Sequence, residues 1–335
     1  IGTVTAQLLY EIAGREYPNP DVIALFDTIK LEDAGRDRVR VFGVKGMPPP
    51  PTTKVCLNYL GGYKTSMTFV LTGLDIEAKA RLTEATLWRL VGGREQFAST
   101  AVRLQRSDKS DPESNDAASA YLTIVVKDPD QAKVGRAFSS KVVEMALASY
   151  PGFYATSPPQ DASQVGVYWP ALVPSEEVEH RLVFGDAVVP IPPTRLPVPA
   201  PPIPAPTTID GAGVAAEPSR TLPLGLLCGA RSGDKGGNAN VGLWVRTVPQ
   251  YRWLVEYLTA DRLKALMPEA ATLVVDRYEL PNLLAVNFVL RGLLGDGVAA
   301  SLRNDPQAKS LGEFLRAKLV PVPVALLPTT TGAAI

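Results

Sequence analysis

Cys228-Gly-Ala-Arg-Ser-Gly-Asp-Lys-Gly-Gly-Asn-Ala-Asn240 decides how the C-terminal part of this chain folds, because it sets glycines and polar side chains between two apolar runs. One interpretation is a ligand-binding loop, in which glycine lets a ligand approach the main chain and exposed N–H groups form an anion nest beside Arg231 and Lys235. The other is a β-hairpin with Gly236-Gly237 or Gly237-Asn238 in its turn. Neither a P-loop spacing nor a GxGxxG run after a strand is present, so both interpretations stay open.

The polar residues of this stretch have chemistry that suits an anionic ligand. Arginine binds phosphate or carboxylate through a bidentate fork, lysine acts as a point charge, and asparagine offers both donors and acceptors. An aspartate pairs with either cation, or acts as a base if it is desolvated. We therefore predict ligand-binding residues at Arg231, Ser232, Asp234, Lys235, Gly236, Gly237, Asn238 and Asn240. The structural alternative for Asp234 and Lys235 is an exposed turn pair of little energetic value.

Hydrophobic periodicity around this stretch predicts a small α+β sandwich. Residues 222–228 and 241–245 read as strands, 253–266 as one or two helical turns that end before Pro268, and 273–280 and 284–290 as a further strand pair. A last helix follows Ser310, with Glu313 completing a capping box and an apolar stripe at Leu311, Phe314, Leu315 and Leu319. The order of two strands, a helix, two strands and a helix favours helices on one face of an antiparallel or mixed sheet, not a doubly wound nucleotide-binding fold.

A proline-rich stretch separates this part from the rest of the chain. Residues 190–206 contain nine prolines, and proline lacks the N–H that helices and central strands need, so an extended spacer is expected. We predict a first domain at 1–189, a linker at 190–220 and a small domain at 221–327. In the first domain we expect strands at 39–44, 55–60, 65–72, 101–104 and 120–127, a helix capped by Asp75, and a second helix with a stripe at Phe138, Val142, Met145 and Ala146.

Composition excludes several classes of function. The chain has 34 basic and 34 acidic side chains, so it has no basic field for nucleic acid or an anionic membrane. No apolar run is long enough to span a bilayer, and a cytoplasmic location is the default expectation. Cys56 and Cys228 are too few and too far apart for a disulfide framework or a zinc site. No metal site is predicted, and no cofactor is assigned.

Other polar and aromatic groups leave weaker alternatives. His180 is the only histidine, so a hydrolytic triad would need it, but its surroundings read as a strand edge. Lys54 or Lys64 can reach an anion beside the turn at 48–51, or that stretch is only a turn. Tyr168 and Trp169 pack against the sheet, or form an aromatic wall for an acyl chain.

Five stretches of this chain together resemble the acyclic terpene utilization family (AtuA-like proteins). They are Thr3-Val-Thr-Ala-Gln-Leu-Leu-Tyr-Glu-Ile12, Pro48-Pro-Pro-Pro-Thr-Thr-Lys54, Leu71-Thr-Gly-Leu-Asp75, Ala230-Arg-Ser-Gly-Asp-Lys-Gly-Gly-Asn238 and Leu315-Arg-Ala-Lys318. The resemblance implies an AtuA domain followed by a ferredoxin-like domain. It also implies that the first domain is truncated here, since the chain begins at Ile1 within what reads as a folded element.

The resemblance implies a pathway rather than a reaction. It suggests an enzyme or enzyme subunit in acyclic terpene or branched acyl-CoA catabolism that binds an acyl-CoA or other anionic metabolite, and it brings no catalytic residues. The alternative is a non-catalytic interaction or oligomerisation module of a larger complex. Under either function we expect a homo-oligomer or a complex with another protein chain.

Overall fold

The computed structural model describes residues 1–146, 148–192, 205, 209 and 218–327. Helices and strands are mixed, with mostly antiparallel strand pairs, as the sequence predicted. The chain forms two compact units. Unit 1 contains residues 1–57, 169–298 and 305–335, and unit 2 contains residues 58–168 and 299–304. No helix within the described ranges is both long and apolar enough to cross a membrane.

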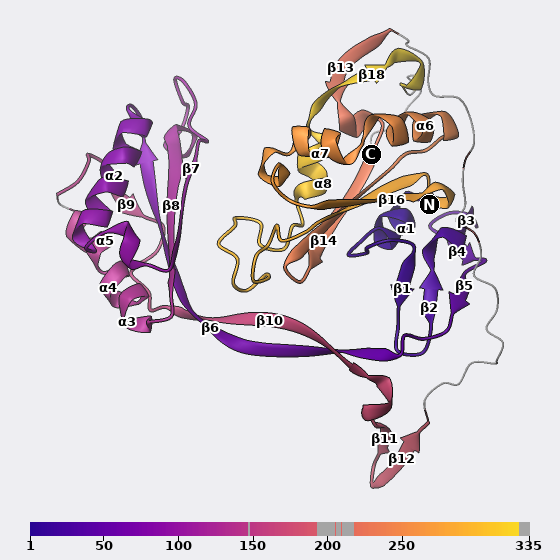
Figure 1. Ribbon diagram of the computed structural model, residues 1–335. Coiled ribbons are helices and arrows are strands. Elements are labelled where there is room, and N and C mark those ends of the chain that lie inside the picture. The colour runs from indigo at the N-terminus through magenta and orange to yellow at the C-terminus, as the bar shows by residue number, and fades with distance from the viewer. Residues whose placement is uncertain (147, 193–204, 206–208, 210–217, 328–335) are drawn as a thin grey trace. The chain divides into compact units, whose positions relative to one another are not determined.

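Unit 2 is a sheet with helices on one face (Figure 1). The strand order is β10-β6-β8-β7, and β9 pairs with β6. The strands are β6 (Thr52–Thr72), β7 (Ser99–Gln105), β8 (Ser119–Asp128), β9 (Tyr154–Ala155) and β10 (Ser163–Pro174). The helices are α2 (Ile76–Leu90), α3 (Gln131–Val134), α4 (Arg136–Ser139) and α5 (Lys141–Met145), with short 3-10 turns at Arg94–Gln96 and Asp116–Ala118. Alternate residues of β6 and β8, such as Phe69 and Leu122, pack against these helices.

Several predicted elements of the first domain differ from the structure. Residues 55–60 and 65–72 are one continuous strand, because Gly62 adopts φ +97° and lets the strand continue where a Cβ would lie 2.7 Å from the Asp128 carbonyl oxygen. Asp75 precedes α2 but its side chain makes no capping hydrogen bond. The second predicted helix is divided into two short helices, α4 and α5, with Phe138, Val142 and Met145 buried and Ala146 exposed.

The centre of unit 1 is a four-stranded antiparallel sheet in the order β14-β15-β17-β16. Its strands are β14 (Gly229–Lys235), β15 (Asn238–Trp244), β16 (Val275–Leu280) and β17 (Ala285–Leu290). One face packs against α6 (Val248–Tyr257), α7 (Ala260–Leu266) and α8 (Leu311–Arg316) (Figure 1). Val241, Leu243, Val286 and Phe288 point into this core. The predicted fold class of the small domain, an α+β arrangement with helices on one face of an antiparallel sheet, is therefore confirmed.

The edges of this domain correct three sequence predictions. Residues 222–228 are not one strand: β13 (Ser219–Pro223) ends at a proline and a 3-10 turn at Leu224–Leu226 follows. β13 pairs with β18 (Leu319–Pro323), which is followed by a 3-10 turn at Val324–Leu326. Ser310 makes no capping hydrogen bond to α8, because its hydroxyl donates to Asp305 instead. Phe314 and Leu319 are exposed rather than part of the apolar stripe.

The N-terminal segment of unit 1 covers the second face of this sheet. It contains α1 (Gly2–Leu8), the sheet β1-β2-β5 (Glu16–Pro18, Ile23–Leu25, Lys45–Met47) and the pair β3–β4 (Lys30–Asp33, Val39–Phe42), with a 3-10 turn at Phe26–Thr28. The strand predicted at 39–44 ends at Phe42, and Gly43 follows with φ +76°. Leu9 and Ile12 pack with Leu280, Leu283 and Ala285, at the 3-10 turn Pro281–Leu283, whereas the 3-10 turn at Pro268–Ala270 follows α7 on the helix side.

A separate hairpin, β11 (His180–Phe184) with β12 (Ala187–Ile191), follows β10 and the 3-10 turn at Ser175–Glu177. All ten strand residues are exposed. His180 is therefore on a strand, as expected, but is not buried among catalytic partners. Trp169 is exposed in β10, so its predicted burial against the sheet is wrong. Most of the predicted linker at 190–220 lies outside the described residues.

Candidate functional site

The stretch from Cys228 to Asn240 is a β-hairpin and not a long loop. β14 and β15 pair with Lys235 opposite Asn238, which leaves only Gly236 and Gly237 in the turn. Gly236 has φ +65°, as such a tight turn requires. A Cβ on Gly237 would lie 2.3 Å from the carbonyl oxygen of Gly295, so only glycine fits there. The hairpin interpretation is confirmed, and the polar side chains are presented by strands.

Ser232 fastens the helix-facing side of this hairpin. Its hydroxyl donates to the Lys309 carbonyl (3.1 Å) and accepts from the Gly312 amide (3.0 Å) at the start of α8. Ser232 is 1% exposed, so these bonds satisfy a polar group that burial would otherwise make costly. Ser232 therefore positions Lys309 rather than facing a ligand.

Asn240 and Asn287 bind the main chain of the N-terminal segment on the opposite face. Asn240 Nδ2 donates to the Leu9 carbonyl (2.8 Å) and to Asn287 Oδ1 (2.9 Å), and its Oδ1 accepts from the Glu11 amide (2.9 Å). Asn287 Nδ2 in turn donates to the carbonyls of Ala13 (2.6 Å) and Ile12 (3.3 Å). Both asparagines are fully buried. This pair of amides fixes residues 9–13 on the sheet.

Gly233 lets Tyr10 and Glu11 lie directly on the hairpin. A Cβ at Gly233 would be 2.7 Å from Glu11 Cγ and 2.8 Å from Tyr10 Cε2. Glu11 itself adopts φ +56°, in the left-handed region that non-glycine residues rarely occupy. The amide clamp from Asn240 holds it there, and such strained residues are concentrated at functional sites.

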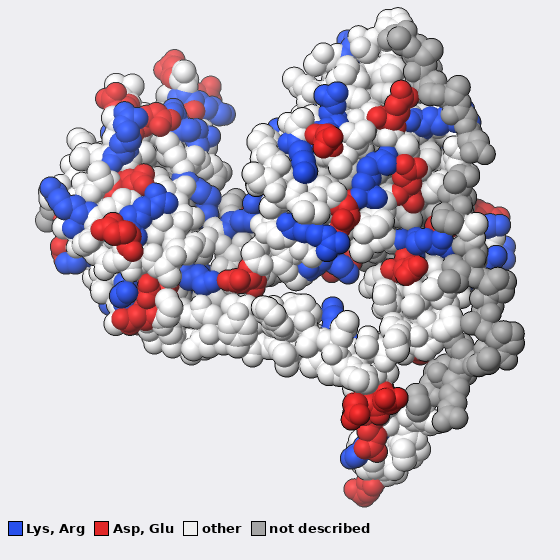
Figure 2. All heavy atoms as spheres, in the orientation of Figure 1, with Lys and Arg blue, Asp and Glu red and all other residues white. Residues whose placement is uncertain are grey.

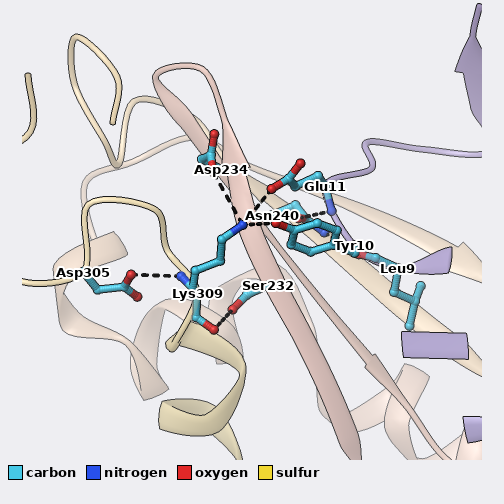
Figure 3. A network of polar contacts seen from close by, with 8 residues as sticks. All are labelled: Leu9, Tyr10, Glu11, Ser232, Asp234, Asn240, Asp305 and Lys309. Atoms are coloured by element: carbon cyan, nitrogen blue, oxygen red, sulfur yellow. Dashed lines mark hydrogen bonds and ion pairs between the residues drawn. The ribbon is translucent and has the colours of Figure 1, made fainter. Parts of the chain in front are cut away.

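Lys309 joins the two faces across the free edge of β14 (Figure 3). Its ammonium pairs with the Glu11 carboxylate (2.9 Å) and Asp234 (3.8 Å) and contacts the Tyr10 hydroxyl. Asp305 holds the Lys309 main chain by accepting from its amide (2.9 Å). One lysine thus links a carboxylate of the N-terminal segment with one from the hairpin.

The hairpin itself has two cations, Arg231 and Lys235. The nearby carboxylates of Glu11 and Asp234 form their ion pairs with Lys309 instead. Arg231 lies over the Tyr10 ring, 4.4 Å from its centroid. Within the described ranges neither side chain has a carboxylate at ion-pair distance. Both residues are exposed at the surface. Alternation along β14 places them on the same face as Gly233, so they border Tyr10 and Glu11.

Burial shifts the pKa values of three charged side chains in this cluster. Desolvation, and next the charge of Asp234, raise the pKa of Glu11, against the opposing effects of Lys235 and Arg231. Desolvation lowers the pKa of Lys309. Partial desolvation, and next repulsion from Lys54, lower the pKa of Lys235. A group of perturbed charges around one strained residue is typical of a functional site.

The structure gathers half of the eight predicted residues around the N-terminal segment. Arg231, Asp234, Lys235 and Asn240 lie at Tyr10 and Glu11, whereas Asn238 is used to accept a hydrogen bond from the Gly292 amide (2.8 Å). Sequence reasoning missed Tyr10, Glu11 and Lys309. Tyr10 and Glu11 were inside a stretch that carried the family resemblance, which was the available signal. Lys309 had none.

The cluster does not resemble a metal centre. In the part of the chain that the structure describes, no three His, Cys, Asp or Glu residues lie close enough together to hold an ion. Glu11 and Asp234 instead share an ion pair with Lys309. The arrangement can bind an anion through Arg231 and Lys235, and it holds a carboxylate and a phenol at the same place.

Comparisons with known protein families identify matches for both parts of the chain. Residues 1–184 match the model of the acyclic terpene utilisation family protein AtuA, and residues 222–321 match the AtuA ferredoxin-like domain. No curated protein and no solved structure matches the chain. The cluster described above joins residues of both matched regions, since Tyr10 and Glu11 belong to the first and Arg231, Lys235 and Lys309 to the second.

Proposed function

Because the chain belongs to the acyclic terpene utilisation family AtuA, we propose that it binds an anionic metabolite, such as an acyl-CoA of acyclic terpene or branched-chain catabolism, beside Arg231 and Lys235. Family membership suggests a role in acyclic terpene utilisation. The ligand class is the part that we propose. In this function the chain acts as an enzyme or as a subunit of one.

One observation carries the proposal: two cations on one strand face have no carboxylate at ion-pair distance among the residues that the structure describes, although Glu11 and Asp234 lie beside them. Lys309 takes up those two acids and thereby leaves Arg231 and Lys235 for another anion. Lys54 adds a third positive charge close enough to lower the pKa of Lys235. Holding like charges together costs free energy that a bound phosphate or carboxylate would offset.

Titration calorimetry on the full chain with geranyl-CoA, citronellyl-CoA and free CoA tests this function. We expect binding that weakens at least about tenfold in the double variant Arg231→Gln, Lys235→Gln, because one charge-assisted contact contributes about 1.5–3 kcal/mol. The matched control is Arg246→Gln with Lys45→Gln, which removes the same charges from exposed positions of the same unit. No binding by the wild type, or equal binding by both double variants, would contradict the proposal.

We also propose a second function, an interaction or oligomerisation module, because a different observation favours it. The β11–β12 hairpin exposes large apolar side chains, up to 82% for Phe184. Soluble monomers rarely expose contiguous apolar patches of several hundred Å² without using them for binding. The surface and its partner are argued below.

A further inference from the structure

The β11–β12 hairpin is a two-stranded sheet with no third strand among the described residues. Its strands pair over five positions, from His180 opposite Ile191 to Phe184 opposite Ala187. An isolated two-stranded hairpin is marginally stable in water, and such sheets need an apolar face packed against something else. This hairpin has the apolar residues but shows no packing partner within the described ranges, since all ten of its residues are exposed.

The two faces of the hairpin differ in charge. Alternation and the strand register place six residues on one face, none of them Asp, Glu, Lys or Arg: His180, Leu182, Phe184, Ala187, Val189 and Ile191. We call this set the uncharged face. The opposite face holds Arg181 with Val183, Val188 and Pro190. Arg181 pairs with Glu179, which precedes the strand.

The exposed apolar area is large enough to matter. The four large apolar residues of the uncharged face are between 47% and 82% exposed. Together they present on the order of 400 Å², about half of the roughly 800 Å² that one partner contributes to a standard interface. Trp169 and Leu172 of β10, which leads into the hairpin, are also exposed. Two copies of the uncharged face therefore supply an interface at the small end of the range for specific complexes.

We infer that the uncharged face packs against the same face of a second copy of this chain, around a two-fold axis. Apolar sheet faces pack on one another about 10 Å apart, and a two-fold interface uses the same patch on both subunits. A second copy brings no Asp, Glu, Lys or Arg side chain onto this face, so no such charge has to be desolvated. This inference rests on the second function proposed above, for which it names the surface and the partner, and not on the ligand site.

The charges around the hairpin disfavour a membrane as the occupant. Glu176, Glu177 and Glu179 precede β11, and Asp186 lies in its turn; all four are exposed. Figure 2 shows acidic side chains gathered at this end of β10 and over the hairpin. Anionic lipid surfaces attract basic segments and repel such an acidic one.

Sedimentation equilibrium of the full chain tests the inference with matched variants. We expect a wild-type dimer at micromolar concentration, and at least a hundredfold weaker association in Leu182→Ser with Val189→Ser. The control, Val183→Ser with Val188→Ser, makes the same kind of change on the opposite face and should associate within about threefold of the wild type. These residues are exposed, so neither double variant should unfold, which circular dichroism checks.

Cross-linking gives a second readout, because a disulfide traps the associated form covalently and reports which face is in contact. In a Cys56→Ser background, which removes the exposed thiol, Val189→Cys should form a disulfide-linked dimer on mild oxidation and Val188→Cys should not. A monomeric wild type, or equal association of the two double variants, would overturn the inference. If a monomeric wild type still bound another protein or a vesicle through Leu182 and Val189, the interaction function would survive while the second copy would not. Absence of every partner would overturn both.

Discussion

Two β-hairpins of this molecule have similar lengths and opposite surroundings. The β14–β15 hairpin packs against α8 on one face and against residues 9–13 on the other, whereas every strand residue of the β11–β12 hairpin is exposed. Polar residues of the first hairpin make hydrogen bonds to distant segments of the chain. The apolar residues of the second hairpin remain exposed. The comparison shows that the burial of a hairpin depends on which distant segments of the chain pack against it. The apolar character of its own residues does not decide this.

The polar residues of the β14–β15 hairpin do not by themselves indicate a ligand site, because several of them make contacts within the protein. Ser232 and Asn240 are used for internal bonds, and Asp234 pairs with Lys309. Arg231 and Lys235 are left exposed, with no carboxylate at ion-pair distance in the part of the chain that the structure describes. The ligand site that we propose is therefore smaller than the motif that suggested it.

The largest difference is expected from the same substitution in each hairpin. Leu243→Ala in β15 removes a fully buried side chain and should lower the free energy of unfolding by about 3–5 kcal/mol. Leu182→Ala in β11, which is half exposed, should cost less than about 1 kcal/mol in dilute protein. Urea unfolding of both variants measures the difference. Equal losses would mean that the β11–β12 hairpin is covered within one chain.

The buried amide of Asn240 should have the next largest effect. Asn240→Ala removes the group that bonds the Leu9 carbonyl, the Glu11 amide and Asn287, leaving buried polar groups unsatisfied at about 1–3 kcal/mol each. We expect a loss of about 2–4 kcal/mol. Hydrogen exchange should show faster exchange at the Glu11 amide.

The control for that variant is Asn238→Ala in the same strand, which loses one exposed bond to the Gly292 amide. It should cost less than about 1 kcal/mol. Slow exchange at Glu11 in the Asn240 variant would show that residues 9–13 are held by apolar contacts alone.

A methyl group at Gly233 tests the close approach of Tyr10 and Glu11. Gly233→Ala would place a Cβ within 2.8 Å of both side chains, and such overpacking costs about 1–3 kcal/mol. We expect about 1–2 kcal/mol, because the contacted atoms belong to side chains that can shift. Gly166→Ala in β10 is the control, since nothing lies within 4 Å of its Cβ. A Gly233 variant as stable as that control would contradict the packing described here.

The sequence predicted local features of this fold well. Alternating residues in 284–290 identified β17, and Gly236-Gly237 was one of the two turns offered by the hairpin interpretation, which the sequence left open beside a ligand-binding loop. Residues of α2 repeat at helical spacing and were found for the same reason. Each of these features depends on neighbours within a few positions.

The sequence could not show the features that depend on distant segments. Asn240 binds Glu11 across 229 positions, and nothing in the local pattern separates a clamping asparagine from a ligand-binding one. The capping box at Ser310 failed because Asp305 competes for its hydroxyl. Lys309 reads as an ordinary surface lysine until the fold brings Glu11 to it.

The smallest expected effect concerns the charge of Glu11, and its sign follows from the raised pKa. Because the folded state raises the pKa of Glu11 above its ordinary value of 4.5, it binds the proton more tightly than the unfolded state. That contribution is fully present below pH 4.5 and is lost as the pH rises through the folded value. Glu11→Gln cannot titrate, so the stability of the wild type relative to this variant should fall as the pH rises from 4 to 7.

About a third of the Glu11 side chain is exposed, so solvent screening keeps the change below about 1 kcal/mol. Urea unfolding of both proteins across this pH range measures it. The Lys309 ion pair, present only in the wild type above that pKa, works in the opposite direction. A wild type that gains on the variant with rising pH would show that this ion pair outweighs desolvation and repulsion from Asp234. Glu11 would then act as a structural partner of Lys309, because the ion pair between them would stabilise the folded chain.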